Sequence, residues 1–189
     1  MQLPTDWFKD TADVQVIDNF LTGKELEDLT HHVKAAGFTF GWKSNQNLGY
    51  AHWNHTFAGR DKHRRDPVES YLDHVCSPVV SKMKHYMPSN ARIIRCYSNA
   101  YTYGTEGYPH TDSNYSGDIT AMVYLNDLWD RAWAGETVFF DEQEIVKSVM
   151  PKYGRLVLFH SEMLHAARSV SRVCPDARIV FVVKAKTHD

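Results

Sequence analysis

The sequence is poor in cysteine, has no long hydrophobic run and carries almost no net charge. Its three cysteines, Cys76, Cys96 and Cys174, are far apart and odd in number, which argues against a disulfide framework and a Cys-x-x-Cys zinc site. We expect them to be small buried hydrophobic residues. No window approaches the roughly 18 uninterrupted apolar residues of a membrane span, and the N-terminus lacks the regions of a signal peptide. The sequence therefore predicts a cytoplasmic protein without a membrane partner.

The charge balance argues against a general attraction to nucleic acid. The formal net charge is -2, with 43% apolar and 23% charged residues, as is typical of soluble globular proteins. A local exception is the basic cluster from Lys62 to Arg65. Because Asp61 and Asp66 flank this cluster, a solvated loop is favoured over a binding site for nucleic acid or an acidic partner.

The first predicted helix follows a short predicted strand over residues 14–20. Thr22 is placed as the N-cap, with Glu25 three residues later, and Gly37 ends the helix. An apolar stripe at helical spacing predicts that this helix packs on a sheet. The stripe consists of Leu26, Leu29 and Val33.

A second predicted helix follows a polar and aromatic segment. Residues 38–66 are punctuated by glycine, which suits a hairpin or a long loop. The helix is expected to start near Pro67, to be kinked or split at Pro78, and to be closed by Pro88 and Asn90.

The chain after position 90 consists of short predicted strands separated by turn signals. No helices alternate with these strands, which argues against a parallel α/β sheet and predicts a mainly β fold of the jelly-roll type, a double-stranded β-helix. We expect one domain over residues 1–189, with helical support in 1–90 and a jelly-roll core in 91–186. The predicted strands are ARIIRCYSNAYTY, ITAMVYLN, ETVFFD, IVKSVM, RLVLFH, ARSVS and RIVFVVKAK.

Candidate metal ligands occur in the stretch GYPHTDS, where His110 and Asp112 are one residue apart. In an extended chain such residues point to the same side, so both could bind one ion. A third ligand must come from a distant strand, and His165 after RLVLF is the candidate. Two histidines and a carboxylate form the facial triad that holds Fe(II) and leaves coordination positions open. Alone, the His-x-Asp pattern is weak and also fits two polar residues at a turn.

Two further residues could bind a carboxylate. Arg178 opens the last, apolar strand, where it is either an exposed strand-start arginine or a bidentate fork for a carboxylate. Tyr124 in MVYLN could donate to the same carboxylate through its phenol, or it could be a core tyrosine.

The ordered set of motifs resembles the Fe(II)/2-oxoglutarate-dependent dioxygenases, and within them the prolyl 4-hydroxylase-like branch that includes the hypoxia-sensing prolyl hydroxylases. The resemblance covers residues 91–184. It depends on Cys96-Tyr97, His110-Thr111-Asp112, Tyr124-Leu125-Asn126 with Trp129, Gly135-Glu136-Thr137, His165 and Arg178.

The resemblance implies a catalytic jelly roll in which His110, Asp112 and His165 bind iron. It implies that Arg178 and Tyr124 hold the C5 carboxylate of 2-oxoglutarate and that Tyr97 lines the pocket near the metal. The implied cofactor is Fe(II), the implied co-substrates are 2-oxoglutarate and O2, and ascorbate is a further candidate. The implied reaction is hydroxylation of a C–H bond, with 2-oxoglutarate converted to succinate and CO2.

Two departures from the family pattern and one match to it affect this implication. The family's usual second glycine is Glu136 here, and Lys184 takes the place of an aromatic residue late in the last strand. Because related halogenases have glycine or alanine at the carboxylate position, Asp112 favours hydroxylation over halogenation.

The substrate is expected to contact residues 42–66 and 98–108. In the first segment Trp53 and Arg60 could form a substrate wall, although a surface hairpin with a packed tryptophan explains them equally. In the second, Tyr103 could belong to a mobile loop over the site. Three alternatives stay open: a hydroxylase of a prolyl or other residue in a peptide or protein, a hydroxylase of a free amino acid or small metabolite, and a non-catalytic jelly-roll binding domain.

Overall fold

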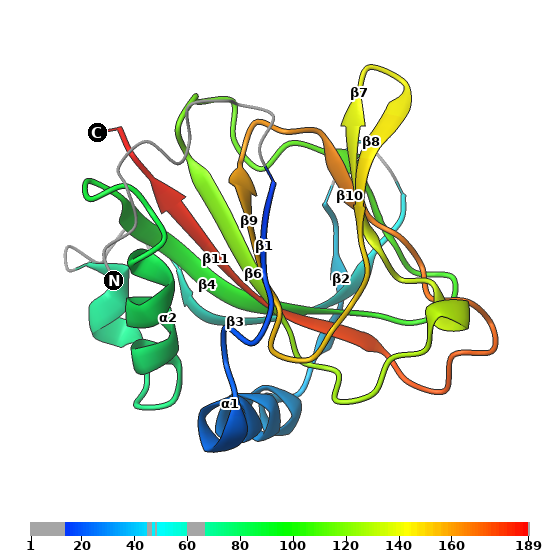
Figure 1. Ribbon diagram of the computed structural model, residues 1–189, viewed down its shortest axis with the longest axis horizontal. Helices are drawn as coiled ribbons and strands as arrows, with labels where there is room; N and C mark the ends of the chain where they lie inside the picture. The colour runs from blue at the N-terminus through cyan, green and yellow to red at the C-terminus, as the bar shows by residue number, and fades with distance from the viewer. Residues whose placement is uncertain (1–13, 45–46, 48, 60–66, 189) are drawn as a thin grey trace.

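The fold consists of two facing antiparallel sheets, with helices against the outer face of the larger one (Figure 1). The computed structural model describes residues 14–44, 47, 49–59 and 67–188. In spatial order, the large sheet contains β1 (Gln15–Ile17), β9 (Leu156–His160), β6 (Ile119–Tyr124), β11 (Arg178–Lys186), β4 (Arg92–Tyr101), β3 (His52–Gly59) and β2 (Thr39–Trp42). The small sheet contains β5 (Gly107–His110), β10 (His165–Ala167), β7 (Thr137–Asp141) and β8 (Glu144–Val149). The predicted mainly β jelly roll is confirmed.

The helices are α1 (Gly23–Ala36) and α2 (Cys76–Lys84), with short 3-10 segments at Val68–Tyr71 and Arg131–Trp133. Side chains alternate between the two faces of each strand, so the large sheet supports two separate cores. One core joins the sheet to α1 and α2, through residues such as Leu29, Val33, Val79, Met83, Cys96, Ala100, Val123, Leu158 and Phe181. The other lies between the sheets and contains Val14, Tyr97, Met122, Tyr124, Phe139, Val149, Val157, Phe159, Val180 and Val182.

The expected first helix is confirmed, since α1 begins after Thr22 and ends before Gly37, whose φ of 74° suits glycine. Thr22 makes no side-chain capping hydrogen bond, so the expected capping interaction is not formed. Residues 38–66 include the antiparallel pair β2–β3, which confirms the hairpin alternative. The three strands β1 to β3 therefore join the large sheet from the segment expected to provide helical support.

The second predicted helix is divided by the extended segment around Leu72, and Pro78 lies in the first turn of α2, where a missing N–H is harmless. The strand expected at ARSVS is wrong in position, because β10 ends at Ala167 and Val170 forms only an isolated bridge with Ala134. Pairing with both β5 and β7 determines where β10 lies, and that pairing is not visible in the local sequence. None of the helices in the described ranges is long and apolar enough to span a membrane.

Candidate metal centre and anion pocket

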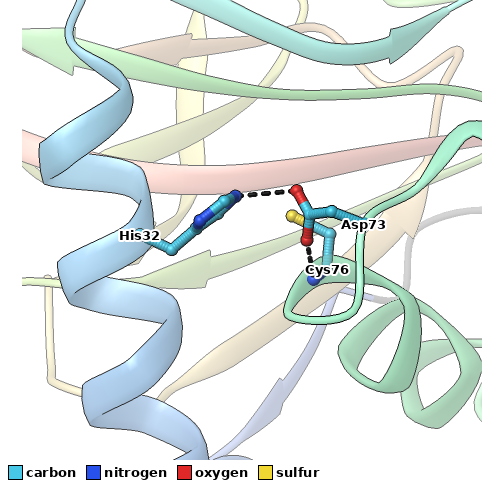
Figure 2. A group of neighbouring side chains, drawn as sticks. All are labelled: His32, Asp73 and Cys76. Carbon is cyan, nitrogen blue, oxygen red and sulfur yellow. Dashed lines mark hydrogen bonds and ion pairs between the residues drawn. The ribbon is translucent and has the colours of Figure 1, made fainter.

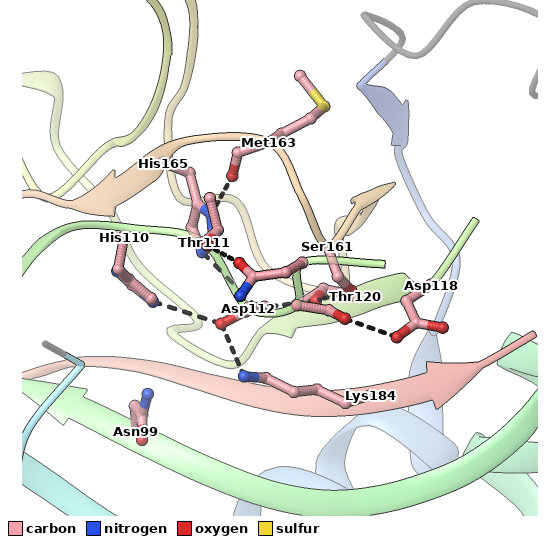
Figure 3. Close-up of polar contacts among 12 residues, drawn as sticks. Asn99, His110, Thr111, Asp112, Asp118, Thr120, Ser161, Met163, His165 and Lys184 are labelled. Atoms are coloured by element: carbon pink, nitrogen blue, oxygen red, sulfur yellow. Dashed lines mark hydrogen bonds and ion pairs between the residues drawn. The ribbon is translucent and has the colours of Figure 1, made fainter. Parts of the chain in front are cut away.

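Strand pairing brings the three predicted ligands together. His110 ends β5, and His165 begins β10 directly opposite it in the register. Their ring centroids are 4.4 Å apart. Asp112 follows β5 in a turn that is fixed because the amides of Asp112 and Ser113 both donate to the Ser161 carbonyl, at 2.7 and 3.0 Å. Figure 3 shows both imidazoles directed toward the Asp112 carboxylate.

Backbone carbonyls determine which nitrogen of each imidazole is available. His110 Nδ1 lies 2.6 Å from the Tyr108 carbonyl, and His165 Nδ1 lies 2.9 Å from the Met163 carbonyl. A carbonyl can only accept, so each Nδ1 carries the proton and each Nε2 keeps its lone pair. Burial lowers the pKa of His165 to about 4, which keeps this ring neutral at neutral pH. Nε2 of His165 is therefore in the state that a metal requires, and the hydrogen bond at Nδ1 of His110 leaves its Nε2 directed toward Asp112.

Asp112 is a buried carboxylate held by cationic and hydroxyl donors. Lys184 Nζ donates to Oδ1 at 2.6 Å, and Thr120 Oγ1 donates to Oδ2 at 2.7 Å (Figure 3). Burial raises the pKa of Asp112, but the Lys184 ammonium and the two imidazoles outweigh it and hold the pKa well below its ordinary value. The carboxylate is therefore ionised, as a metal ligand must be.

One ligand atom from each of His110, Asp112 and His165 lies within 4.8 Å of the other two. Neutral imidazoles plus a carboxylate on one side suit a divalent first-row metal that keeps open positions. The three residues thus fit Fe(II).

These ligands line a cavity of about 240 Å³ between the sheets. Its wall includes Arg178, the first residue of β11, whose side chain is 0% exposed. Other lining residues are Trp42, Lys43, Ser44, Arg95, Tyr97, Asn99, Tyr101, Thr111, Thr120, Met122, Thr137, Phe159, Ala167, Val180, Val182 and Lys184.

Three hydrogen bonds hold the Arg178 guanidinium, and they involve two of its three nitrogens. Nε donates to the Gly135 carbonyl at 2.6 Å, and Nη2 donates to Thr137 Oγ1 at 2.7 Å and to the Tyr124 hydroxyl at 3.5 Å. Nη1 is buried and has no hydrogen-bond partner among the residues that the structure describes. Within the described ranges no carboxylate pairs with Arg178. A buried cation needs an anion, so this end of the cavity suits the carboxylate of a small ligand.

The predicted tyrosines take different positions around the cavity. Tyr97 lines it, and burial raises the pKa of its phenol well above the ordinary value. Tyr124 lies behind the lining, where its hydroxyl is 2.7 Å from Thr137 Oγ1 and donates to the Val149 carbonyl at 3.1 Å. Any effect of Tyr124 on a ligand carboxylate would therefore act through its contacts with Arg178 and Thr137.

The two predicted substrate residues that the structure describes, Trp53 and Tyr103, do not line the cavity. Trp53 contacts Phe40 with ring centroids 5.1 Å apart and ring planes tilted by 59°, and it packs against the helix-side core. Tyr103 is 67% exposed in the turn between β4 and β5. The segment 98–108, expected to be a mobile loop, is strand at both ends, because it includes the end of β4 and the first half of β5, and only the residues between them form a turn. Arg60 and the basic cluster from Lys62 to Arg65 lie outside the described residues.

On the face of β4 that lines the cavity, sequence reasoning found Tyr97 but missed Arg95, Asn99 and Tyr101. Alternate residues of this strand, Arg95, Tyr97, Asn99 and Tyr101, line the cavity. The period-two alternation of polar and aromatic residues in RCYSNAY was the signal that could have found them. Thr137 was also missed, although it lies in the motif that carries the family resemblance.

A second group of possible ligands lies between the helices (Figure 2). His32 Nε2 is 2.8 Å from Asp73 Oδ2, while Asp73 Oδ1 accepts from the amides of Val75 and Cys76 at 2.9 and 2.8 Å. The carboxylate thus caps the start of α2 and ties it to α1. Since both oxygens are engaged in this way, the structural role explains the group.

Comparisons with known proteins agree with this geometry. Residues 96–183 match the sequence model of the 2OG-Fe(II) oxygenase superfamily. No curated protein matches the sequence.

Solved structures with the same fold span almost the whole chain. A Trichoplax adhaerens prolyl hydroxylase, in complex with a hypoxia inducible factor peptide fragment, is 18% identical, with 96% of this chain and 86% of that chain covered and a TM-score of 0.67. A 2OG-Fe(II) oxygenase family oxidoreductase from Burkholderia pseudomallei is 13% identical, with coverages of 93% and 86% and a TM-score of 0.72. The carbocyclase SnoK from nogalamycin biosynthesis is 12% identical, with coverages of 96% and 81% and a TM-score of 0.64. These likenesses establish the fold.

Proposed function

We propose that this chain is a 2OG-Fe(II) oxygenase, since the model of that superfamily matches residues 96–183, and that it hydroxylates an unactivated C–H bond of a substrate. In this proposal His110, Asp112 and His165 bind Fe(II), and Arg178 binds the C5 carboxylate of 2-oxoglutarate. When bound, the iron and 2-oxoglutarate supply the oxidation, in which O2 is consumed and 2-oxoglutarate becomes succinate and CO2. Ascorbate is included as a reductant to be tested.

The observation that carries this proposal is the partnerless Nη1 of buried Arg178. A metal triad alone would also fit other metalloenzymes, because many of them use histidine and carboxylate ligands. A buried guanidinium on the wall of the same cavity adds a need for a carboxylate ligand. A dicarboxylate co-substrate meets both requirements, since one end can chelate the metal while the other pairs with Arg178.

Neighbouring residues fix the position of the Arg178 guanidinium. Thr137 and the Gly135 carbonyl fix the guanidinium plane, and the Tyr124 hydroxyl supports both Thr137 and Arg178. Tyr97 is placed beside the metal ligands, where its aromatic face helps to exclude water. We assign Tyr124 a supporting role and Tyr97 a lining role in 2-oxoglutarate binding.

Two substrate classes follow from different observations. The prolyl 4-hydroxylase-like branch suggests a prolyl or other residue in a peptide, supported by the fold shared with a peptide-bound prolyl hydroxylase. A free amino acid or small metabolite is supported by Arg95, a fixed positive charge on the cavity wall. We favour the small molecule, because the fixed positive charge of Arg95 on the cavity wall can bind a negatively charged group of the substrate itself.

Two broader proposals accompany this function. We propose that residues 1–189 form one domain, because β1 to β3 extend the same sheet that carries β4, β6, β9 and β11. We also propose a cytoplasmic location, which is supported by the low cysteine content of the sequence.

The test is succinate formation from 2-oxoglutarate with Fe(II) and O2, together with direct Fe(II) binding. We expect His165→Ala to abolish both, and Arg178→Met to weaken 2-oxoglutarate binding while Fe(II) binding persists. His31→Ala, an exposed histidine on α1, is the matched control and should behave like the native protein. Absence of Fe(II) binding by the native protein, together with no succinate across peptide and amino-acid libraries, would contradict the proposal.

A further inference from the structure

The cavity carries more positive charge than the proposed cofactor and co-substrate require. Among the described residues whose contacts are known, three cationic side chains line it, Arg95, Arg178 and Lys184, against the one carboxylate of Asp112. Fe(II) and the dianion of 2-oxoglutarate cancel each other in charge, so filling the site with both leaves the excess unchanged. An enclosed site with such an excess attracts an additional anion.

Two of these cations have identified functions. Arg178 faces the proposed C5 carboxylate, as argued above. Lys184 is engaged with Asp112, since its Nζ lies 2.6 Å from Oδ1 of that carboxylate. Lys184 therefore supports the proposed metal ligand Asp112. Arg95 is the remaining candidate for binding a further anion.

Arg95 lies on β4 directly opposite Lys184 on β11. Its guanidinium carbon is 4.1 Å from the centroid of the Trp42 ring and 4.3 Å from that of Tyr97. Its hydrogen-bond contact is long, from Nη2 to Thr56 Oγ1 at 3.4 Å. Over the ranges that the structure describes, no carboxylate lies within ion-pair distance of Arg95.

The two aromatic rings give Arg95 a fixed orientation. Stacking uses the faces of the guanidinium and leaves its edge, with the N–H donors, for a planar ligand. Burial lowers the pKa of Arg95, which shows that removal from water is unfavourable for this cation, although a guanidinium remains protonated. An anion on that edge would offset the unfavourable burial.

Arg95 is too far along the sheet to share an anion with Arg178. On β11, Arg178 pairs with Tyr101 and Lys184 pairs with Arg95, so six residues separate the two positions along either strand. At about 3.3 Å per residue this is roughly 20 Å of backbone. One carboxylate cannot bind at both positions, and Arg95 must serve a different ligand.

We propose that Arg95, clamped between Trp42 and Tyr97, binds a carboxylate of the primary substrate, so that the enzyme acts on a small carboxylic acid. This rests on the proposed function, because it treats the cavity as an active site. Trp42 and Tyr97 position the guanidinium, and the proposed metal ligands line the same cavity. Recognition of the carboxylate selects the substrate and orients its reacting carbon toward the metal ligands.

The test measures binding to protein loaded with Mn(II) and 2-oxoglutarate, so that no turnover is needed. The probes are the proteinogenic amino acids and their N-acetyl derivatives, each compared with its own primary amide. We expect at least one acid to bind about 10- to 100-fold more tightly than its amide, as a charge-assisted bidentate contact supplies. Arg95→Gln should reduce this ratio to about one.

Two further variants make the result specific to the guanidinium. Arg95→Lys keeps the charge but loses the planar fork, and we expect an intermediate ratio. Arg92→Gln, an exposed arginine at the start of the same strand, is the matched control and should keep the full ratio. Folding of each variant is checked by its thermal unfolding curve.

Each outcome decides the proposal. If no acid binds more tightly than its amide, or if the preference survives in Arg95→Gln, Arg95 is not a carboxylate receptor. If Arg95→Gln weakens 2-oxoglutarate binding as much as acid binding, Arg95 belongs to the co-substrate pocket and the proposal is wrong. Succinate formation by the native protein in these cases would show that the proposed function stands while this inference fails.

Discussion

The two faces of the large sheet are built from the same strands but have opposite characters. On β4, Cys96 and Ala100 face the helices and join an apolar core, whereas Arg95 and Asn99 face the cavity. The helix-side face is buried against the helices, and its packing requires apolar side chains without particular chemical groups. The cavity face holds charged and aromatic groups whose contacts depend on neighbouring strands. The helix-side face therefore supplies folding stability alone, whereas the other face combines a second apolar core with the binding groups.

A single irregularity keeps these two faces in register. Between Lys184 and Ala185 of β11 the pairing with β4 shifts, so that Lys184 is opposite Arg95 and Ala185 is opposite Ile93. The extra residue, Ile94, returns Ile93 to the helix-side core while Arg95 remains on the cavity side. Such a bulge re-aims side chains near functional sites. The contrast between the faces can be tested by changing each one separately.

The largest expected effect is on the cavity face, from His110→Ala. Loss of one of the three proposed metal ligands should reduce Fe(II)-dependent succinate formation by more than about 100-fold. Loss of a residue that only orients a metal ligand reduces metal affinity or activity by up to about 100-fold, and loss of the ligand itself should have a larger effect. The free energy of unfolding should change much less than for a truncation in the core, because the imidazole lines the cavity and belongs to neither apolar core. Turnover assays and urea denaturation measure the two effects. Equal losses of stability and activity would show that the faces are not separable.

The matching change on the helix side is Leu29→Ala, at a residue that is 0% exposed in α1. A buried leucine truncation should lower the free energy of unfolding by about 2–5 kcal/mol. The folded fraction should retain its affinity for Fe(II) and 2-oxoglutarate. Leu128→Ala, at a residue that is 70% exposed, is the control and should leave stability nearly unchanged. Urea denaturation of both variants provides the measurement.

A smaller effect is expected from Lys184→Met, which removes the donor to Asp112 Oδ1 and keeps a similar side-chain length. Partners that orient a metal ligand typically contribute about 10-fold or more to metal affinity, so we expect roughly a tenfold weaker Fe(II) site. Titration with Fe(II) under anaerobic conditions measures this change. Unchanged affinity would mean that Thr120 alone orients the carboxylate.

The smallest effect is expected from Asp73→Asn at the helix contact. Burial raises the pKa of Asp73, but the Cys76 and Val75 amides and His32 outweigh it and lower the pKa below its ordinary value of 3.8. The charge therefore stabilises the fold at higher pH, and this contribution is lost as the pH falls below about 4 through the lowered pKa. Because the pair is partly exposed, solvent screening limits its ion-pair contribution to less than about 1 kcal/mol.

Urea denaturation over a pH series checks this last prediction. The native protein should be slightly more stable than Asp73→Asn at pH 7, and the two curves should converge in acid. A difference that grows in acid would contradict the assignment of Asp73 as an ionised helix cap.

Much of the fold could be predicted because its signals are local. The helix from Thr22 to Gly37 and most strands after position 90 follow from periodicity and turn residues, and they were confirmed. The position of β10 was not predictable, since its limits come from pairing with β5 and β7. For the same reason the sequence could not show that β1, β2 and β3 join the large sheet.

The sequence by itself determined the candidate ligand set, because residue chemistry and spacing indicated His110, Asp112 and His165, which the register of β5 and β10 brings together. Only the tertiary structure decided how charge is distributed around them. The sequence allowed Arg178 to be an exposed strand-start residue, yet it is completely buried, and Lys184 is paired with Asp112. Burial and pairing across strands are properties of the packed sheets, which is why Arg95, unremarkable in the sequence, became a second candidate for binding an anion.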